Sequence, residues 1–306
     1  MNNSGHKHFI IWGVILLISA LIEFTVGPVE EYLLRLSPIS IYKLPIHAYF
    51  SIIATIIASL IAWLAALTIG GALGLFTAAG ELASREKGPV YASWNSLSKA
   101  IRRTFNAIYV IPLVLTLSVV GTILLQLHSN KSINSQQVGF ILIIASGITL
   151  AGQRIYIALD DAISTASSDD LILANSLYLG NDENAHNSLR KFYRLWLEAK
   201  FLISCRISLL TQAIEQAFHL SVVGVIILET TSVAPFIYEY IFPQEGAIIN
   251  WGGGIGRVII DGQNATNPEL VAGAVWLILL IDSALAWLIR SRIYKNWIHP
   301  YRSNQS

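Results

Sequence analysis

The feature that most constrains this chain is a series of long apolar segments, several of them close to the ~20 residues that cross a bilayer as a helix. The longest, residues 47–79, contains no Asp, Glu, Lys or Arg. The whole chain is 54% hydrophobic and only 13% charged, about half the charged fraction of a typical soluble domain. Because lipid offers no hydrogen-bond partner to the backbone, such segments form helices there. We therefore predict an all-α, polytopic integral membrane protein.

Hydropathy predicts six membrane spans, so both termini should lie on the same side of the membrane. The predicted spans cover residues 9–26, part of 47–79, 105–127, 138–158, 201–228 and 269–290. Lys and Arg concentrate in the segments on the side of the termini, whereas the opposite segments hold only Arg35, Lys43, Lys131 and Arg257. Since cytoplasmic loops carry the excess of positive charge, we expect both termini in the cytoplasm.

The segment 171–197, "LILANSLYLGNDENAHNSLRKFYRLWL", differs from its apolar surroundings. It has the polar and apolar periodicity of a water-exposed amphipathic helix, although it lies between the fourth and fifth predicted spans. Gly180 and Asn181 interrupt this pattern, and a second helical pattern follows through Phe192 and Trp196. The segment therefore predicts a cytoplasmic helix-turn-helix whose apolar stripe packs against its own bundle or a partner protein.

The fifth predicted span carries four polar side chains on one helical face, at positions i, i+3, i+4 and i+7. These are Gln212, Glu215, Gln216 and His219. Polar and ionisable residues are expensive in hydrocarbon and usually face a cavity or a partner. We predict that they line a translocation path, together with Glu229 at the outer end of the span. Asp282 in the sixth span is interpreted instead as a structural hydrogen bond or ion pair.

Gly70, Gly71 and Gly74 recur at three- to four-residue spacing in the second span. Small residues let helices approach closely in lipid, so we expect these glycines to mediate helix packing. Cys205 is the single cysteine, which excludes an intramolecular disulfide. We interpret it as a small, buried apolar side chain.

Motifs for catalysis and metal binding are missing from the sequence. There is no H-E-x-x-H, G-x-S-x-G or Walker A motif, so we predict no catalytic residue, metal site or ATPase activity in this chain. The acidic pairs of "DDAISTASSDD" stand nine residues apart. An intramembrane prenyltransferase that binds Mg²⁺-diphosphate would need carboxylates one helical turn apart, and this spacing disfavours it.

Several motifs, in order, resemble the permease subunits of bacterial ABC importers. The segments "ANSLYLG" (174–180) and "KFYRLWLEAKF" (191–201) resemble that family's cytoplasmic coupling segment, E-A-A-x-x-x-G followed by an aromatic, a basic residue and L-P. The segments "LTIGGALGLF" and "AIYVIPLVLTLSVVG", Glu229 before "GGGIGRVI", Asp282 and Trp297 resemble the nitrate, sulfonate, taurine and bicarbonate branch. The chain departs from the coupling motif at Ala174, which replaces its glutamate, and at Glu198, which replaces its proline.

This resemblance implies an N-terminal span and outer segment in 1–46, a permease domain in 47–300 with its coupling loop at 160–200, and a tail at 301–306. It implies a multi-pass protein of the cell inner membrane whose ATP and Mg²⁺ are bound by a separate ATP-hydrolysing subunit. The other expected partners are a second permease copy or a paralogous permease, an extracytoplasmic substrate-binding protein and the bilayer, with no nucleic acid. The residues expected to couple to the ATPase are Ala174, Gly180, Phe192, Arg194, Leu195 and Trp196.

An ion- or proton-coupled secondary carrier is the alternative hypothesis, with Glu215 and His219 as a proton relay. Carriers often contain inverted repeats, and the two halves of this sequence show no convincing repeat. The cytoplasmic helix-turn-helix would also have no role in a carrier. The sequence therefore favours the permease.

Overall fold

The structure is a computed structural model that describes residues 13–15, 17–18, 35–84, 89–110, 113–178, 188–231, 233–241 and 253–293. All regular secondary structure in these ranges is helical, which confirms the all-α prediction. Four helical segments are long and apolar enough to cross a membrane: Ile46–Ala83, Ser135–Ser164, Ile207–Glu229 and Pro268–Arg292. They correspond to the second, fourth, fifth and sixth predicted spans. Most of the first predicted span lies outside the described residues.

Two long helices form the centre of the bundle, and each contains a π-helical segment. The first runs through α3 (Ile46–Ala65), η2 (Ala66–Gly70) and α4 (Gly71–Ala83), and the second through α7 (Ser135–Ser146), η3 (Gly147–Gly152) and α8 (Gln153–Ser164). They cross at η2 and η3, where a Cβ on Gly70 would lie 2.4 Å from the Gly152 carbonyl oxygen. A Cβ on Gly147 would lie 2.1 Å from the Ala62 carbonyl oxygen. Glycine thus permits backbone contact at the crossing.

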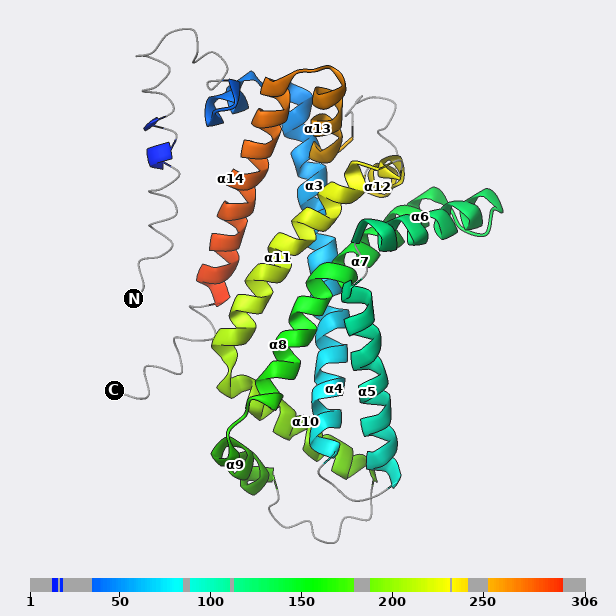
Figure 1. The fold of residues 1–306 in the computed structure, drawn as a ribbon, viewed down its shortest axis with the longest axis vertical. Helices are drawn as coiled ribbons and strands as arrows, with labels where there is room; N and C mark the ends of the chain where they lie inside the picture. Colours follow the sequence, from blue (N-terminus) through cyan, green and yellow to red (C-terminus); the bar gives the residue numbers. More distant parts are fainter. Residues whose placement is uncertain are drawn as a thin grey trace.

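The predicted span 105–127 is not one helix. The described residues of this segment belong to two helices, α5 (Pro89–Val110) and α6 (Leu113–Ser129). Helix α5 packs beside α4, whereas α6 extends away from the bundle in a hairpin with α7 (Figure 1). The count of six spans is therefore not confirmed at this segment, where the apolar helix Leu115–Ser129 is shorter than the four candidate spans.

The remaining helices complete the two ends of the bundle. Helices α9 (Ser168–Tyr178) and α10 (Ser188–Cys205) lie at one end, beside the end of α4 (Figure 1). At the opposite end lie η1 (Pro38–Lys43), α12 (Ala234–Ile241) and α13 (Ile255–Asn264). Helices α11 (Ile207–Glu229) and α14 (Pro268–Ile293) run between the two ends.

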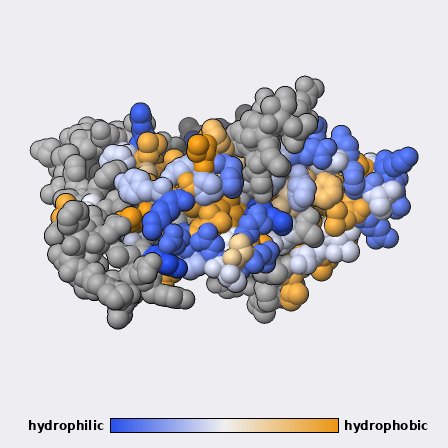
Figure 2. All heavy atoms as spheres, turned by 90° about the horizontal axis from the view of Figure 1, so that it is seen from above, coloured by the Kyte–Doolittle hydropathy of each residue, from blue (hydrophilic) through white to orange (hydrophobic). Residues whose placement is uncertain are grey.

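Buried apolar side chains form three clusters along the bundle. The cluster nearest α9 joins α4, α5, α8 and α10, a central cluster joins α3, α6, α7, α11 and α12, and a third joins α3, α13 and α14. Figure 2 looks down on the end that carries α13, where hydrophilic residues cover much of the described surface with apolar residues between them. The apolar interior and polar end match a bundle that crosses a membrane.

Candidate functional site on the α8, α11 and α14 face

The polar stripe predicted on the fifth span exists on α11, but it does not face a single neighbour. Glu215 and His219 contact α14, whereas Gln216 contacts α8. Gln212 is exposed and lines a cavity between α8 and α11. The four side chains therefore form a polar strip along α11, with Glu215 and His219 toward α14 and Gln212 and Gln216 toward α8.

Two polar pairs join α11 to α14. His219 Nδ1 lies 2.5 Å from Asp282 Oδ2, and Arg290 Nε lies 3.7 Å from Glu215 Oε2. The side chains of His219 and Arg290 are 39% and 47% exposed. Asp282 thus has the hydrogen-bond or ion-pair partner that the sequence analysis predicted, and that partner is His219. Asp282 Oδ1 is buried and has no hydrogen-bond partner in the described part of the chain.

A third polar pair joins α11 to α8. Arg154 Nε donates a hydrogen bond of 2.6 Å to Gln216 Oε1. The adjoining cavity is lined by Arg154, Asp161, Gln212 and Gln216 together with four apolar residues, Ile157, Ala158, Leu209 and Ala213. The sequence interpretation grouped Arg154 with the cytoplasmic positive charges and missed this position. An arginine inside the apolar segment Ser135–Ser164, ten residues before its end, was the available signal.

The three polar pairs between α11 and its neighbours indicate a polar environment, because they lie within candidate membrane spans and are partly exposed. Charged side chains in hydrocarbon cost about 2.5–3.5 kcal/mol or more at a helix centre, and they are found almost always facing a bundle interior or a water-filled cavity. The face formed by α8, α11 and α14 is therefore suited to water, a polar solute or another subunit rather than to lipid.

Glu229, which was also predicted as a path residue, does not lie on this face. Its carboxylate is fully buried and accepts hydrogen bonds from the Thr55 hydroxyl (2.7 Å) and the Gly256 N–H (3.0 Å). Thr55 Oγ1 also accepts the Ile255 N–H at 3.1 Å. Glu229 thus stabilises the N-terminus of α13, where backbone N–H groups and the helix dipole favour a carboxylate.

The glycines of "GGGIG" allow this close approach. A Cβ on Gly254 would lie 2.0 Å from Glu229 Oε1, and a Cβ on Gly256 would lie 2.7 Å from the Ile226 carbonyl oxygen. Tyr238 on α12 also approaches the carboxylate, and burial raises the pKa of its hydroxyl, which therefore stays protonated. Glu229 and the glycines consequently form a structural junction of α3, α11, α12 and α13.

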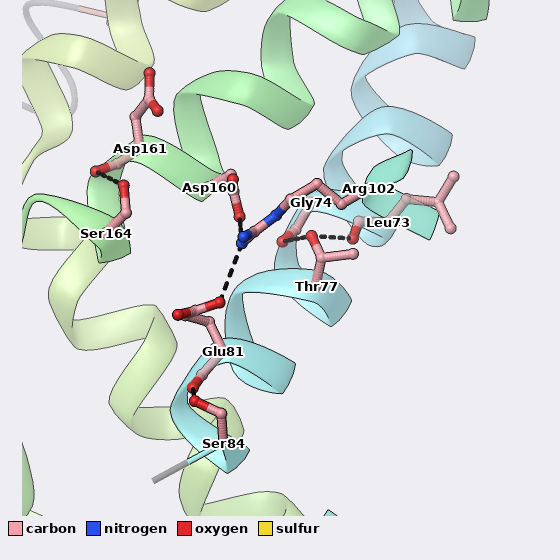
Figure 3. Close-up of polar contacts among 9 residues, drawn as sticks. All are labelled: Leu73, Gly74, Thr77, Glu81, Ser84, Arg102, Asp160, Asp161 and Ser164. Carbon is pink, nitrogen blue, oxygen red and sulfur yellow. Dashed lines mark hydrogen bonds and ion pairs between the residues drawn. The ribbon is translucent and has the colours of Figure 1, made fainter. Parts of the chain in front are cut away.

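A second ionic cluster holds α5 against α4 and α8 (Figure 3). Arg102 Nη2 lies 2.5 Å from Asp160 Oδ1 and 3.3 Å from Glu81 Oε2. Asp161, the next residue on α8, points away from this cluster in Figure 3. The two adjacent carboxylates of α8 therefore point in different directions. Asp160 binds Arg102 of α5, and Asp161 lines the cavity beside α11.

The segment predicted as a coupling loop contains α9 and α10, and Gly180 lies outside the described residues. Ala174 lies on α9 and Phe192 on α10. Leu195 is 1% exposed within the core of the bundle, so its expected contact with a partner is not available in this conformation. Trp196 is partly buried, and Arg194 forms an ion pair of 3.2 Å with Glu198 on the same helix.

Two features at this end were not predicted. Ile172 and Leu173 on α9 are 67% and 51% exposed, although α9 lies outside the candidate membrane spans. Cys205 is exposed at the end of α10, which corrects its interpretation as a buried side chain. Partial desolvation of the Cys205 thiol and the charge of Asp170 raise its pKa, so the thiol stays largely protonated near neutral pH.

Comparisons with known proteins identify no relative: no family model, no curated protein and no solved structure matches the chain. The described residues contain no group of three or more His, Cys, Asp or Glu side chains that could hold a metal ion.

Proposed function

We propose that this chain is the permease subunit of an ATP-binding-cassette importer. In this proposal the α8, α11 and α14 face forms part of the path for a small solute. Helix α9 docks onto a separate ATP-hydrolysing subunit, and a second permease copy or a paralogue completes the assembly. The observation that carries the proposal is the exposed apolar pair Ile172 and Leu173 at a polar end of the bundle.

An exposed apolar patch on a helix outside the membrane is typical of a protein interaction site. Leu171 packs against the bundle core while the next two residues on α9 stay exposed, so the helix has one attached face and one available face. The charges of Asp169 and Asp170 in the first turn of α9 would keep this end in water. The excess of Lys and Arg in the sequence supports a cytoplasmic location for this side.

Two connections would carry movement of α9 into the membrane. Helix α9 contacts α10, which continues through Arg206 directly into α11. Arg206 Nη2 also donates a hydrogen bond of 2.9 Å to the Thr165 carbonyl oxygen, at the junction of α8 and α9. A pull on α9 would therefore act on both helices that carry the polar face.

The test is affinity purification of the tagged protein in mild detergent, with identification of co-purifying subunits and assay of their ATPase activity. We expect an ATPase to co-purify with the native chain and to be lost in Ile172→Glu. Tyr42→Glu is the matched control, because Tyr42 is 79% exposed at the opposite end of the bundle. Purification without an ATPase, or equal loss in both variants, would contradict the proposal.

An ion- or proton-coupled carrier is the second candidate, favoured by the His219–Asp282 pair at 2.5 Å between two candidate spans. Such a pair is a typical proton-handling arrangement in membrane transport. Solute uptake into proteoliposomes that contain only this chain and a pH gradient, without ATP, would support the carrier. Uptake that depends on ATP and a second subunit would support the importer.

A further inference from the structure

The cavity between α8 and α11 carries two opposite charges on one helix. Arg154 and Asp161 both line it and both are exposed. In the described part of the chain, neither forms an ion pair. They stand seven residues apart on α8, which places them on the same face and about 10 Å apart along the helix axis. The cavity therefore has a positive end and a negative end.

The positive end has a fixed geometry. The Arg154 Nε–H donates a hydrogen bond of 2.6 Å to Gln216 Oε1. This bond orients the planar guanidinium between α8 and α11. Its terminal N–H groups form the fork that matches a carboxylate. Arg154 lies inside the segment Ser135–Ser164, where an exposed guanidinium needs a polar or anionic neighbour.

The negative end and the middle of the cavity complete the pattern. Asp161 points away from the Arg102 cluster, so its carboxylate is not neutralised by that arginine (Figure 3). Gln212 lies one helical turn before Gln216 on α11 and lines the cavity with it. An amide offers both a donor and an acceptor to a ligand that spans the two charged ends.

We infer that this cavity binds a small linear zwitterion, with an anionic group at Arg154 and Gln216 and an ammonium group at Asp161. The separation of the two charged side chains favours ω-amino acids and dipeptides, whose own charges are several bonds apart. The cavity has a volume of about 100 Å³ and is partly open to solvent. This inference rests on the proposed function, because it names the class of solute carried along the same face.

The test uses the purified protein with its co-purifying subunits in lipid nanodiscs. Calorimetric titration compares 5-aminovalerate with valerate and pentylamine, which share the chain length and each keep one charge. We expect 5-aminovalerate to bind at least tenfold more tightly than either. Arg154→Gln and Asp161→Asn should each reduce its affinity about tenfold or more. Arg103→Gln is the matched control, because Arg103 is exposed on α5 and does not line the cavity.

The outcomes separate the solute class from the transport mechanism. Equal binding of valerate, with no effect of Asp161→Asn, would overturn the zwitterion site, as would absence of binding by all three probes. Retention of the ATPase in those same samples would show that the importer proposal survives. Zwitterion binding by a preparation that contains no ATPase would support the site and contradict the importer.

Discussion

His219 on α11 lies 2.5 Å from Asp282 on α14, and Glu215, one turn earlier on α11, lies 3.7 Å from Arg290. Helix α14 is the least buried of the candidate spans, because only 22% of its most apolar stretch is buried inside the protein. At its other end, α14 packs on η1, where Trp276 Nε1 donates a 2.8 Å hydrogen bond to the Leu36 carbonyl oxygen. The two polar pairs therefore attach the half of α14 nearer α9.

We predict that His219 and Asp282 are energetically coupled. A hydrogen bond to a charged group contributes about 1.5–3 kcal/mol, and removal of either partner leaves the other unsatisfied. A double-mutant cycle with His219→Ala, Asp282→Ala and the double variant should therefore show a double variant that is less destabilised than the sum of the singles. The measurement is unfolding in detergent micelles. Additive effects would show that the contact does not hold the helices together.

The position of Glu215 and His219 on the polar face predicts that their substitution affects transport but not assembly of the complex. Glu215→Gln and His219→Ala should lower solute uptake severalfold while the complex still assembles, because both side chains are partly exposed on the proposed path. Uptake is measured in vesicles, and assembly by size-exclusion chromatography of the same preparation. Unchanged uptake in both variants would remove these two residues from the path.

Substitution of Glu229 should lower the stability of the protein, in contrast to the substitutions of Glu215 and His219, which should lower uptake. Glu229→Ala would leave the buried Gly256 N–H without its acceptor and would remove the partner of Thr55. An unsatisfied buried polar group costs about 1–3 kcal/mol, so we expect lower thermal stability and lower yield of folded protein. Glu229→Gln keeps the volume and one carbonyl acceptor and should be milder. A Glu229→Ala variant that folds normally but transports poorly would restore Glu229 to the path.

The adjacent glycines Gly70 and Gly71 provide a test variant and its matched control for the packing at the helix crossing. A Cβ on Gly70 would meet the backbone of Gly152 at 2.4 Å, whereas a Cβ on the adjacent Gly71 would meet nothing within 4 Å. Overpacking typically costs about 1–3 kcal/mol, and a backbone atom cannot move aside as a flexible side chain can. We therefore expect Gly70→Ala to lower the melting temperature and Gly71→Ala to leave it nearly unchanged. Equal melting temperatures would mean that the two crossing helices can move apart with little loss of stability.

The apolar segments and the glycine spacing allowed the helical class and the packing role of Gly70 to be predicted. Gly71, in the same pattern, faces open space, because periodicity alone does not say which neighbour approaches which face. The stripe on α11 was predicted as one surface, yet its members divide between α8 and α14, since only the tertiary arrangement decides the partners. The burial of Glu229 depends on Thr55 and Gly256, which are far apart in the sequence.

Cys205 provides a test of orientation with the native chain. It is exposed at the end of α10, and as the single cysteine it gives one labelling site. If α9 and α10 are cytoplasmic, a membrane-impermeant maleimide should label inside-out vesicles and leave intact cells unlabelled. The thiolate is the reactive form, so the raised pKa of Cys205 predicts slow labelling near pH 7 that accelerates as the pH rises. Asp170→Asn should speed labelling at pH 8, because Asp170 helps to raise that pKa. Labelling of intact cells would reverse the orientation and would place α9 out of reach of any cytoplasmic ATPase.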